Sequence, residues 1–321
     1  LYADDLTKFK QYNRAIALHQ RHKKLYPEAP RAYEALGDLY VETGDLARAL
    51  ETYEEYRERF PDDPDVLNNM ASLAIRQRDC EPARLYLEEI PVLRPWNAQW
   101  ARIAEAGLIN LEVWDGRFKQ ALRRCERMVQ LSFEMADTSA ILGGYLTLGG
   151  NLRAFGRDDE AWDVYAKAFE YAPIMSQMQF VMLSVDARPD RADELKDRLR
   201  TSVDAFRMNV PSNLWHITDM VETGFKAQAA RDTTALIAVA RDVLEYPPNQ
   251  RTGNEERSLA ELLSRVGAYE EALPLVETGL DTTNGWLYVS TVYWVGVCKQ
   301  GLGDLEGAVG AFEEVLSYWG N

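Results

Sequence analysis

The chain has 321 residues, of which 46% are hydrophobic and 27% are charged, so it can bury a sizeable core. Its 51 acidic and 36 basic residues give a net charge of -15, which disfavours broad binding to a phosphate backbone or to an anionic membrane surface. The three cysteines, Cys80, Cys125 and Cys298, lie far apart and form neither a metal-type spacing nor a disulfide framework.

A short pattern recurs along the chain: a turn of Gly and a polar residue, then a few residues, then Ala before a larger residue. Its clear copies are Gly44-Asp45 with Ala49, Gly116-Arg117 with Ala121, Gly156-Arg157 with Ala161, Gly267-Ala268 with Ala272, and Gly303-Asp304 with Ala308. Less regular copies carry Ala15, Ala83 and Ala235. The alanines are 34 residues apart from 15 to 49 and again from 49 to 83, and later gaps are slightly longer. The gap of 74 residues from 161 to 235 corresponds to two units, the middle one degenerate and centred near Leu195. A period of about 34 residues predicts a tandem helical repeat.

Each unit is predicted to consist of two amphipathic helices joined by a tight turn. Gly44 and Gly303 can adopt the left-handed conformation that ends the first helix, and the Asp that follows each can cap the second helix. Small residues such as Gly37 and Ala49 are expected where the paired helices approach most closely. The second helices are expected to end before Pro61, Pro95, Pro173 and Pro247. One unit alone cannot bury its apolar faces, so neighbouring units must stack.

Two units carry a recurring set of aromatic and small residues. The first holds Tyr33, Leu36, Gly37, Tyr40, Gly44, Ala49, Tyr53, Tyr56 and Pro61, and the second holds Tyr145, Leu148, Gly149, Leu152, Gly156, Ala161, Tyr165, Ala168 and Pro173. With these residues the chain resembles the tetratricopeptide repeat family (TPR) over essentially its whole length. The resemblance implies an all-α fold, a right-handed α-solenoid of about eight to nine TPR-like helix–turn–helix units.

We expect a single TPR superhelix over residues 1–321, with regular repeats over 1–175, degenerate repeats over 176–250 and regular repeats over 251–321. The degenerate part lacks a Gly turn and is interrupted at Arg188-Pro189-Asp190. Pro274 lies inside a predicted second helix, where a kink or a late helix start is expected. No polar capping helix follows the last unit, so the array is expected to continue or its end to pair with another surface.

No arrangement of residues indicates catalysis, a cofactor or a metal site in this chain. Gly143-Gly144 and Gly149-Gly150 lie within a repeat helix and are not followed by the Lys-Ser or Lys-Thr of a phosphate-binding loop. Close helix packing accounts for them better. We therefore expect a non-enzyme without cofactor or metal, although an enzyme domain can exist in a longer chain.

Relatives in the TPR family usually hold ligands in a groove lined by the first helix of each unit. The corresponding positions of this chain are Asn68, Asn69, Ser72, Arg76, Asn110, Arg153, Arg257, Glu261, Arg265 and Tyr293. Some relatives grip a C-terminal carboxylate with two lysines and two asparagines. Here the asparagines are present at Asn68 and Asn69 but the matching lysines are missing, so a clamp of that kind is not expected.

The ending from Ala308 to Trp319 resembles the final repeat of bacterial signalling proteins in which a serine/threonine kinase or nucleotide cyclase domain precedes a helical array. We therefore expect a non-catalytic protein–protein interaction scaffold, the sensory or regulatory TPR region of a larger bacterial signalling protein. Two alternatives stay open: a self-assembly element that forms homo-oligomers through the uncapped last unit, and a small-ligand sensor using the irregular region 176–215.

The expected partners are proteins or peptides, not nucleic acid or the membrane interior. No apolar run reaches the ~18 residues of a spanning helix, so a soluble chain is expected. The cytoplasm is favoured over the alternative, an extracytoplasmic part of a membrane-anchored signalling protein.

Overall fold

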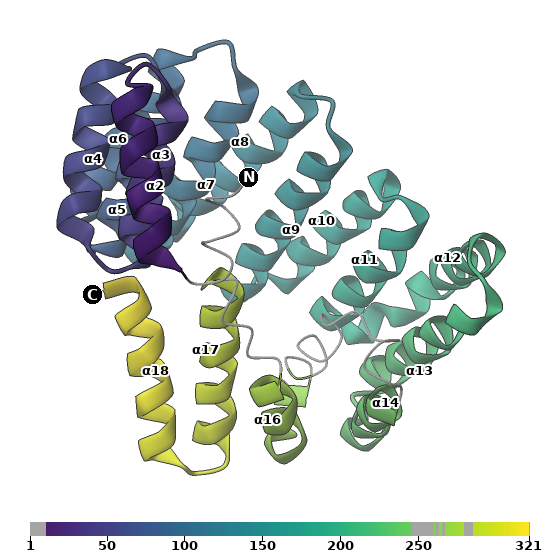
Figure 1. Ribbon diagram of the computed structural model, residues 1–321. Helices are drawn as coiled ribbons and strands as arrows, with labels where there is room; N and C mark the ends of the chain where they lie inside the picture. Colours follow the sequence, from purple (N-terminus) through teal and green to yellow (C-terminus); the bar gives the residue numbers. More distant parts are fainter. Residues whose placement is uncertain (1–10, 246–259, 261–262, 265–266, 279–284, 321) are drawn as a thin grey trace. The chain divides into compact units, whose positions relative to one another are not determined.

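The computed structural model of the protein describes residues 11–245, 260, 263–264, 267–278 and 285–320 (Figure 1). Within these ranges the chain forms sixteen α-helices and two short 3-10 helices, and no β-strand. The chain divides into two compact units, called unit 1 (Leu1–Met135 with Ser317–Asn321) and unit 2 (Ala136–Leu316). The all-α fold built from helix–turn–helix units, predicted from the sequence, is confirmed.

Unit 1 consists of antiparallel helix pairs that follow one another in chain order. Its helices are α2 (Tyr12–Leu25), α3 (Pro30–Glu42), α4 (Leu46–Arg59), α5 (Pro64–Arg76), α6 (Cys80–Leu93), α7 (Ala98–Trp114) and α8 (Phe118–Glu134). The first helices of the pairs are α3, α5 and α7, and the second helices are α4, α6 and α8. Pro30 and Pro64 stand in the first turns of α3 and α5, where a missing N–H costs no hydrogen bond.

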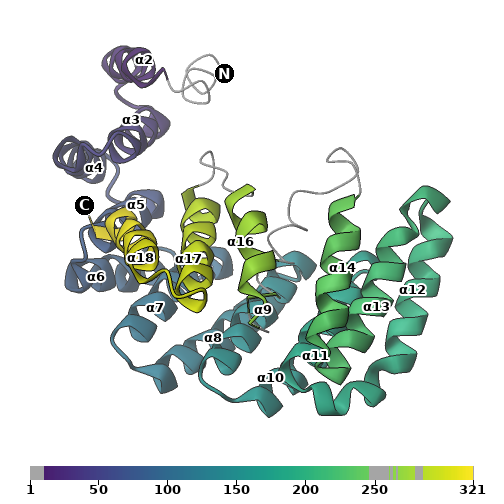
Figure 2. The same cartoon turned by 90° about the horizontal axis from the view of Figure 1, so that it is seen from below.

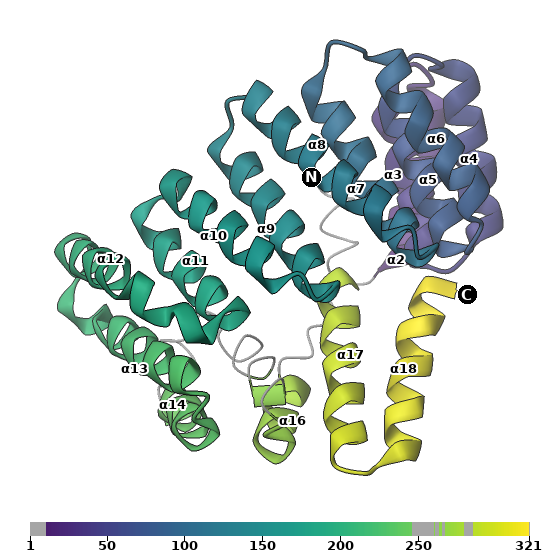
Figure 3. The same ribbon diagram turned by 180° about the vertical axis from the view of Figure 1, so that it is seen from behind.

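Unit 2 continues the alternation, as two further views show (Figures 2 and 3). Its elements are α9 (Thr138–Ala154), α10 (Asp158–Tyr171), α11 (Ile174–Ala187), η1 (Pro189–Leu195), α12 (Lys196–Asn209), η2 (Ser212–Leu214), α13 (His216–Ala230), α14 (Thr233–Glu245), α16 (Tyr269–Thr278), α17 (Gly285–Gly301) and α18 (Leu305–Gly320). The first helices are here α9, α11, α13 and α17. Among the described residues, no helix has both the length and the apolar character that crossing a bilayer requires.

The turns between paired helices have the conformation that the repeated glycines predict. Five glycines take positive φ values, namely Gly44, Gly116, Gly156, Gly267 and Gly303. Arg78 and Arg231 occupy the same place in the less regular units and adopt φ of 58° and 53°, although a Cβ makes this region unfavourable. Asp45 caps α4 because its side chain accepts a hydrogen bond from the Arg48 backbone N–H.

Close contact between paired helices depends on a glycine of the first helix facing an aromatic ring of the second. A Cβ on Gly37 would lie 2.2 Å from Cε1 of Tyr53, and a Cβ on Gly149 would lie 2.3 Å from Cε1 of Tyr165. Both rings are buried. The Tyr53 hydroxyl also donates to Oδ1 of Asp38 at 2.6 Å, so its polar end is satisfied. The predicted role of Gly37 is thus confirmed.

The irregular part of unit 2 begins where the sequence predicted a break. Helix α11 ends at Ala187, and the 3-10 helix η1 starts at Pro189 because proline cannot continue the preceding helical hydrogen bonding. Helix α13 packs against both α11 and η1.

A kink or a late helix start was predicted at Pro274. The late start is wrong, since α16 begins at Tyr269 and includes Pro274 in its second turn. The helix gives up one hydrogen bond there, the one that an N–H at this position would donate to the backbone oxygen of Glu270. Pro247, another predicted helix stop, lies outside the described residues.

Candidate binding site

Four of the residues predicted to line a groove share one helix of unit 1. Asn68, Asn69, Ser72 and Arg76 lie on α5, and Asn110 lies exposed on α7. Nδ2 of Asn69 is enclosed without a hydrogen-bond partner among the described residues. Arg76 contributes to structure rather than to a free surface, because its Nη1 donates to the backbone oxygen of Val41 at 3.4 Å.

The predicted residue Arg153, on α9 of unit 2, is held by acidic residues of its own unit. Its Nη1 donates to Oδ2 of Asp186 on α11, and its Nη2 donates to the Asp186 backbone oxygen at 3.3 Å. Its Nε lies 3.8 Å from Oδ1 of Asp158. Arg153 therefore links successive first helices and keeps a fixed position between them.

Arg153 also lines a cleft of about 900 Å³ within unit 2. The cleft runs along first helices α9, α11 and α13 and reaches the turns that follow them. Its apolar lining includes Leu146, Leu183 and Leu236, and its polar lining includes Arg153, Asp158, Asp186, Gln228, Arg231 and Thr233. Two arginines balance two aspartates, so the lining as a whole is neutral, whereas the chain carries a net charge of -15.

Tyr293 does not line this cleft. Tyr293 on α17 is exposed, and its ring lies 5.4 Å from Trp294 and 5.9 Å from Phe312, measured between ring centroids. Arg257, Glu261 and Arg265 lie outside the described residues. Arg153 is the one predicted residue among those that line the cleft, and Gln228 and Arg231 are among the lining residues that the sequence interpretation missed.

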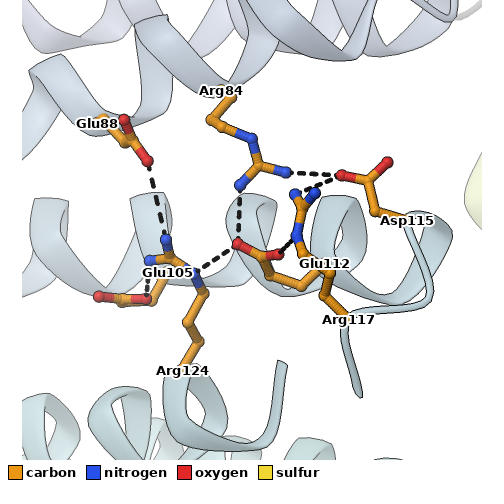
Figure 4. A network of polar contacts seen from close by, with 7 residues as sticks. All are labelled: Arg84, Glu88, Glu105, Glu112, Asp115, Arg117 and Arg124. Atoms are coloured by element: carbon orange, nitrogen blue, oxygen red, sulfur yellow. Dashed lines mark hydrogen bonds and ion pairs between the residues drawn. The ribbon is translucent and has the colours of Figure 1, made fainter. Parts of the chain in front are cut away.

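A network of charged side chains braces unit 1 (Figure 4). At its centre is Glu112 of α7, which is only 3% exposed. Its Oε1 accepts from Nη1 of Arg84 at 2.7 Å and from Nε of Arg124 at 3.3 Å, and its Oε2 accepts from Nε of Arg117. Arg84 also donates to Asp115 at 2.9 Å. The network thus joins α6, α7 and α8.

The ionised form of Glu112 is favoured in the folded chain. Burial alone would raise the pKa of Glu112, but hydrogen bonds from Arg117 and Arg84 outweigh it and hold this pKa below its ordinary value.

A signal in the sequence could have revealed the network. Glu112 stands nine residues before the repeat alanine Ala121, where two other units carry the buried residues Tyr40 and Leu152.

All three arginines that contact Glu112 also pair with other carboxylates, Asp115 for Arg84 and Arg117, and Glu105 for Arg124. We therefore interpret the network as structural and the cleft of unit 2 as the candidate binding site.

Among the described residues, no group of three or more His, Cys, Asp or Glu side chains could hold a metal ion. Burial raises the pKa of the Cys125 thiol to about 12, so this cysteine is a poor nucleophile at neutral pH.

The stacked helix pairs, left-handed turns and glycine–aromatic contacts define an α-helical tandem-repeat protein, a class whose surfaces hold other molecules. Residues 30–73 match the family model of the tetratricopeptide repeat. Residues 30–73 thus form a tetratricopeptide repeat, and the described helix pairs on either side of this match share its helix–turn–helix architecture.

Several solved structures are similar to the chain at low sequence identity. The pilF protein of Pseudomonas aeruginosa is 15% identical, with a TM-score of 0.44 over 68% of this chain and 91% of that chain. The C-terminal part of a TPR repeat-containing protein of Cytophaga hutchinsonii is 15% identical, with a TM-score of 0.47 over 90% of this chain and 98% of that one. A Rap protein, solved in complex with competence and sporulation factor, is 12% identical, with a TM-score of 0.41 over 90% of this chain and 74% of that one.

Proposed function

We propose that this chain is a non-catalytic scaffold that holds a peptide segment of a partner protein in the cleft of unit 2. The TPR fold generally supports protein–protein interaction and is typically non-catalytic. The observation that carries the proposal is the cleft of about 900 Å³, lined by the first helices α9, α11 and α13 and by the second helices α10 and α14. A volume of this size lies in the range of ligand-binding sites.

The chemistry of the cleft favours a polypeptide over the other classes of ligand. Apolar lining residues such as Leu146 and Leu183 can contact apolar side chains, while the balanced charges of Arg153, Arg231, Asp158 and Asp186 can contact polar ones. A nucleic acid would bring many phosphates to a chain with a net charge of -15. The polar residues Asn68, Asn69, Ser72 and Asn110 are proposed as a separate contact surface of unit 1.

The biological setting that we propose is the sensory or regulatory region of a larger bacterial signalling protein. This part of the proposal is supported by the resemblance of the last unit to the final repeat of such proteins. It implies that the partner's binding is communicated to another domain.

Self-assembly through the last unit is a second candidate function, favoured by one observation. Leu305 and Val309 of α18 are 65% and 53% exposed, whereas Leu46 and Leu50, at the corresponding positions of α4, are partly buried against the core of unit 1. The apolar face of α18 is therefore exposed to solvent, whereas the corresponding face of α4 is packed against its own unit. Light scattering that finds only monomers at high protein concentration would exclude this candidate.

Filling the cleft should abolish peptide binding without unfolding the chain. Gly150 lines the cleft on α9, and a Cβ there would meet nothing within 4 Å, so Gly150→Leu adds bulk to open space and improves helix propensity. Binders would be selected from random peptides of about 12 residues, which span roughly 40 Å when extended. We expect Gly150→Leu to weaken their binding about tenfold or more, or by 1.4 kcal/mol or more, measured by calorimetry.

The matched control is Gly143→Leu on the same helix. A Cβ at Gly143 also meets nothing within 4 Å, but Gly143 does not line the cleft. Its peptide affinity should equal that of the unchanged chain. Failure to select any peptide, or equal affinities for both variants, would contradict the proposed function.

A further inference from the structure

Gln228 on α13 is a buried polar residue in the wall of the cleft. Its side chain is only 7% exposed, and its Oε1 has no hydrogen-bond partner among the described residues. Buried polar atoms almost always have a hydrogen-bond partner in folded proteins, because an atom that loses its hydrogen bonds to water without gaining others costs free energy. An unpaired amide in a cleft wall is therefore a group that an occupant can satisfy.

Arg231 lies three residues further on, in the turn that ends α13, and lines the same cleft. It is exposed and forms no ion pair with any described carboxylate, unlike Arg153 in the same lining. Its charge nevertheless adds to that of Arg188 in lowering the pKa of the Asp190 carboxyl. Its guanidinium can therefore bind an incoming anion without first breaking an existing pair.

The backbone of Arg231 is left-handed, with φ of 53°, at a turn position where five other units carry glycine. An arginine there is less favourable than a glycine, because its Cβ crowds the following carbonyl oxygen. Arg78 adopts the same conformation at the equivalent turn of unit 1 without lining the cleft, so the place of Arg231 in the cleft lining, and not its backbone, carries the inference.

We infer that Gln228 and Arg231 form a subsite for an extended peptide that carries a carboxylate. The inference rests on the proposed function and specifies its ligand. The terminal torsion of a glutamine side chain is soft, so the Gln228 amide can turn to pair with a peptide group, accepting from its N–H and donating to its carbonyl oxygen. The Arg231 guanidinium binds the carboxylate next to it with two parallel hydrogen bonds.

Both groups are needed to define this ligand. A free anion such as phosphate would satisfy Arg231 but offers no N–H to Oε1 of Gln228. A basic peptide could satisfy Gln228 but would be repelled by Arg231. The carboxylate can come from an Asp or Glu side chain or from a peptide C-terminus, and the two sources are chemically distinguishable.

The decisive variant is Arg231→Gly, which removes the cation and installs the residue that regular units carry at this turn. It should leave the thermal midpoint unchanged or raise it, because the left-handed turn is relieved. Binding of a peptide selected by the unchanged chain should weaken about tenfold, and the remaining affinity should depend less on salt. The control is Arg78→Gly, the same substitution at the equivalent turn of unit 1, which should not alter peptide affinity.

A second variant, Gln228→Met, tests the amide. It keeps the size of the side chain, and we expect about tenfold weaker binding together with unchanged or higher thermal stability, because an unpaired buried oxygen is removed. Gln179→Met, at an exposed position of α11, is its control. Each selected peptide would be measured with a free and with an amidated C-terminus, and with Asp or Glu replaced by Asn or Gln, to identify the source of the carboxylate.

The outcomes separate this inference from the proposed function. If Gly150→Leu abolishes binding while Arg231→Gly and Gln228→Met bind as the unchanged chain does, the cleft is a binding site but the inferred subsite is wrong. If no peptide binds, or Gly150→Leu has no effect, the proposed function itself fails. Loss of binding in both subsite variants, with both controls unaffected, supports the inference.

Discussion

Replacing Glu112 by Gln should lower the free energy of unfolding by about 1–3 kcal/mol. The substitution removes the buried negative charge that Arg84, Arg117 and Arg124 share, and leaves these three guanidiniums facing a neutral amide. The three arginines keep their ion pairs with Asp115 and Glu105, so the loss is smaller than that of a buried charge left without any partner. Urea denaturation followed by circular dichroism measures the loss.

The control for this prediction is Glu88→Gln. Glu88 is half-exposed, and its Oε1 lies 3.8 Å from Nη2 of Arg124, so an effect within about 1 kcal/mol is expected. Similar losses for both variants would contradict the view that Glu112 organises the network.

The Glu112 carboxylate also makes the free energy of unfolding depend on pH. Because the pKa of Glu112 is lower in the folded chain than its ordinary value, its stabilising contribution is complete above that ordinary value and is lost as the pH falls through the folded pKa. Between about pH 5 and pH 3 the unchanged chain should therefore lose more stability than Glu112→Gln does. Parallel pH profiles for the two chains would exclude this contribution.

The neighbouring glycines of α9 should respond in opposite ways to substitution by alanine. A Cβ on Gly149 would lie 2.3 Å from the Tyr165 ring of α10, so Gly149→Ala must displace a buried aromatic residue. We expect a loss of about 1–3 kcal/mol from overpacking, in excess of the gain in helix propensity. Gly150→Ala meets nothing within 4 Å and should be stabilising by up to about 1 kcal/mol.

This pair of variants tests the packing of α9 against α10, because the two glycines lie in the same helix and undergo the same substitution. Thermal and urea unfolding of the two proteins measure the difference. Equal effects of the two substitutions would contradict the close contact between α9 and α10.

The sequence predicted the helix pairs well because their determinants are local. Gly44 permits the left-handed turn, Asp45 caps the next helix, and Gly37 makes room for Tyr53, and each of these relations spans less than one repeat. The break at Pro189 was also predictable, because proline restricts its own backbone and that of the preceding residue.

The cleft was less predictable because it depends on contacts among several helices. The sequence indicated that Arg153 faces inward, but not that Asp186 of the next first helix holds it. Gln228 and Arg231 lie in a degenerate unit, where the repeat pattern gave no basis for assigning inward positions. The repeat pattern with Ala235 predicted that Ala230 takes the place of the turn glycine. This register is wrong by one residue, because the left-handed residue is Arg231 and the buried residue five positions later is Leu236.

The buried network illustrates a different limit. A glutamate in place of Tyr40 or Leu152 is visible in the sequence, but its partners come from both neighbouring helices. Repeat proteins tolerate such substitutions because each unit contacts mainly its neighbours, so a local charge can be compensated locally.

Hydrogen exchange with and without a selected peptide tests most directly whether the cleft of unit 2 holds the partner. Binding there should slow exchange of backbone amides in α9, α11 and α13, and the effect should disappear in Gly150→Leu. Slower exchange confined to α3–α6, with the three cleft helices unchanged, would contradict the account.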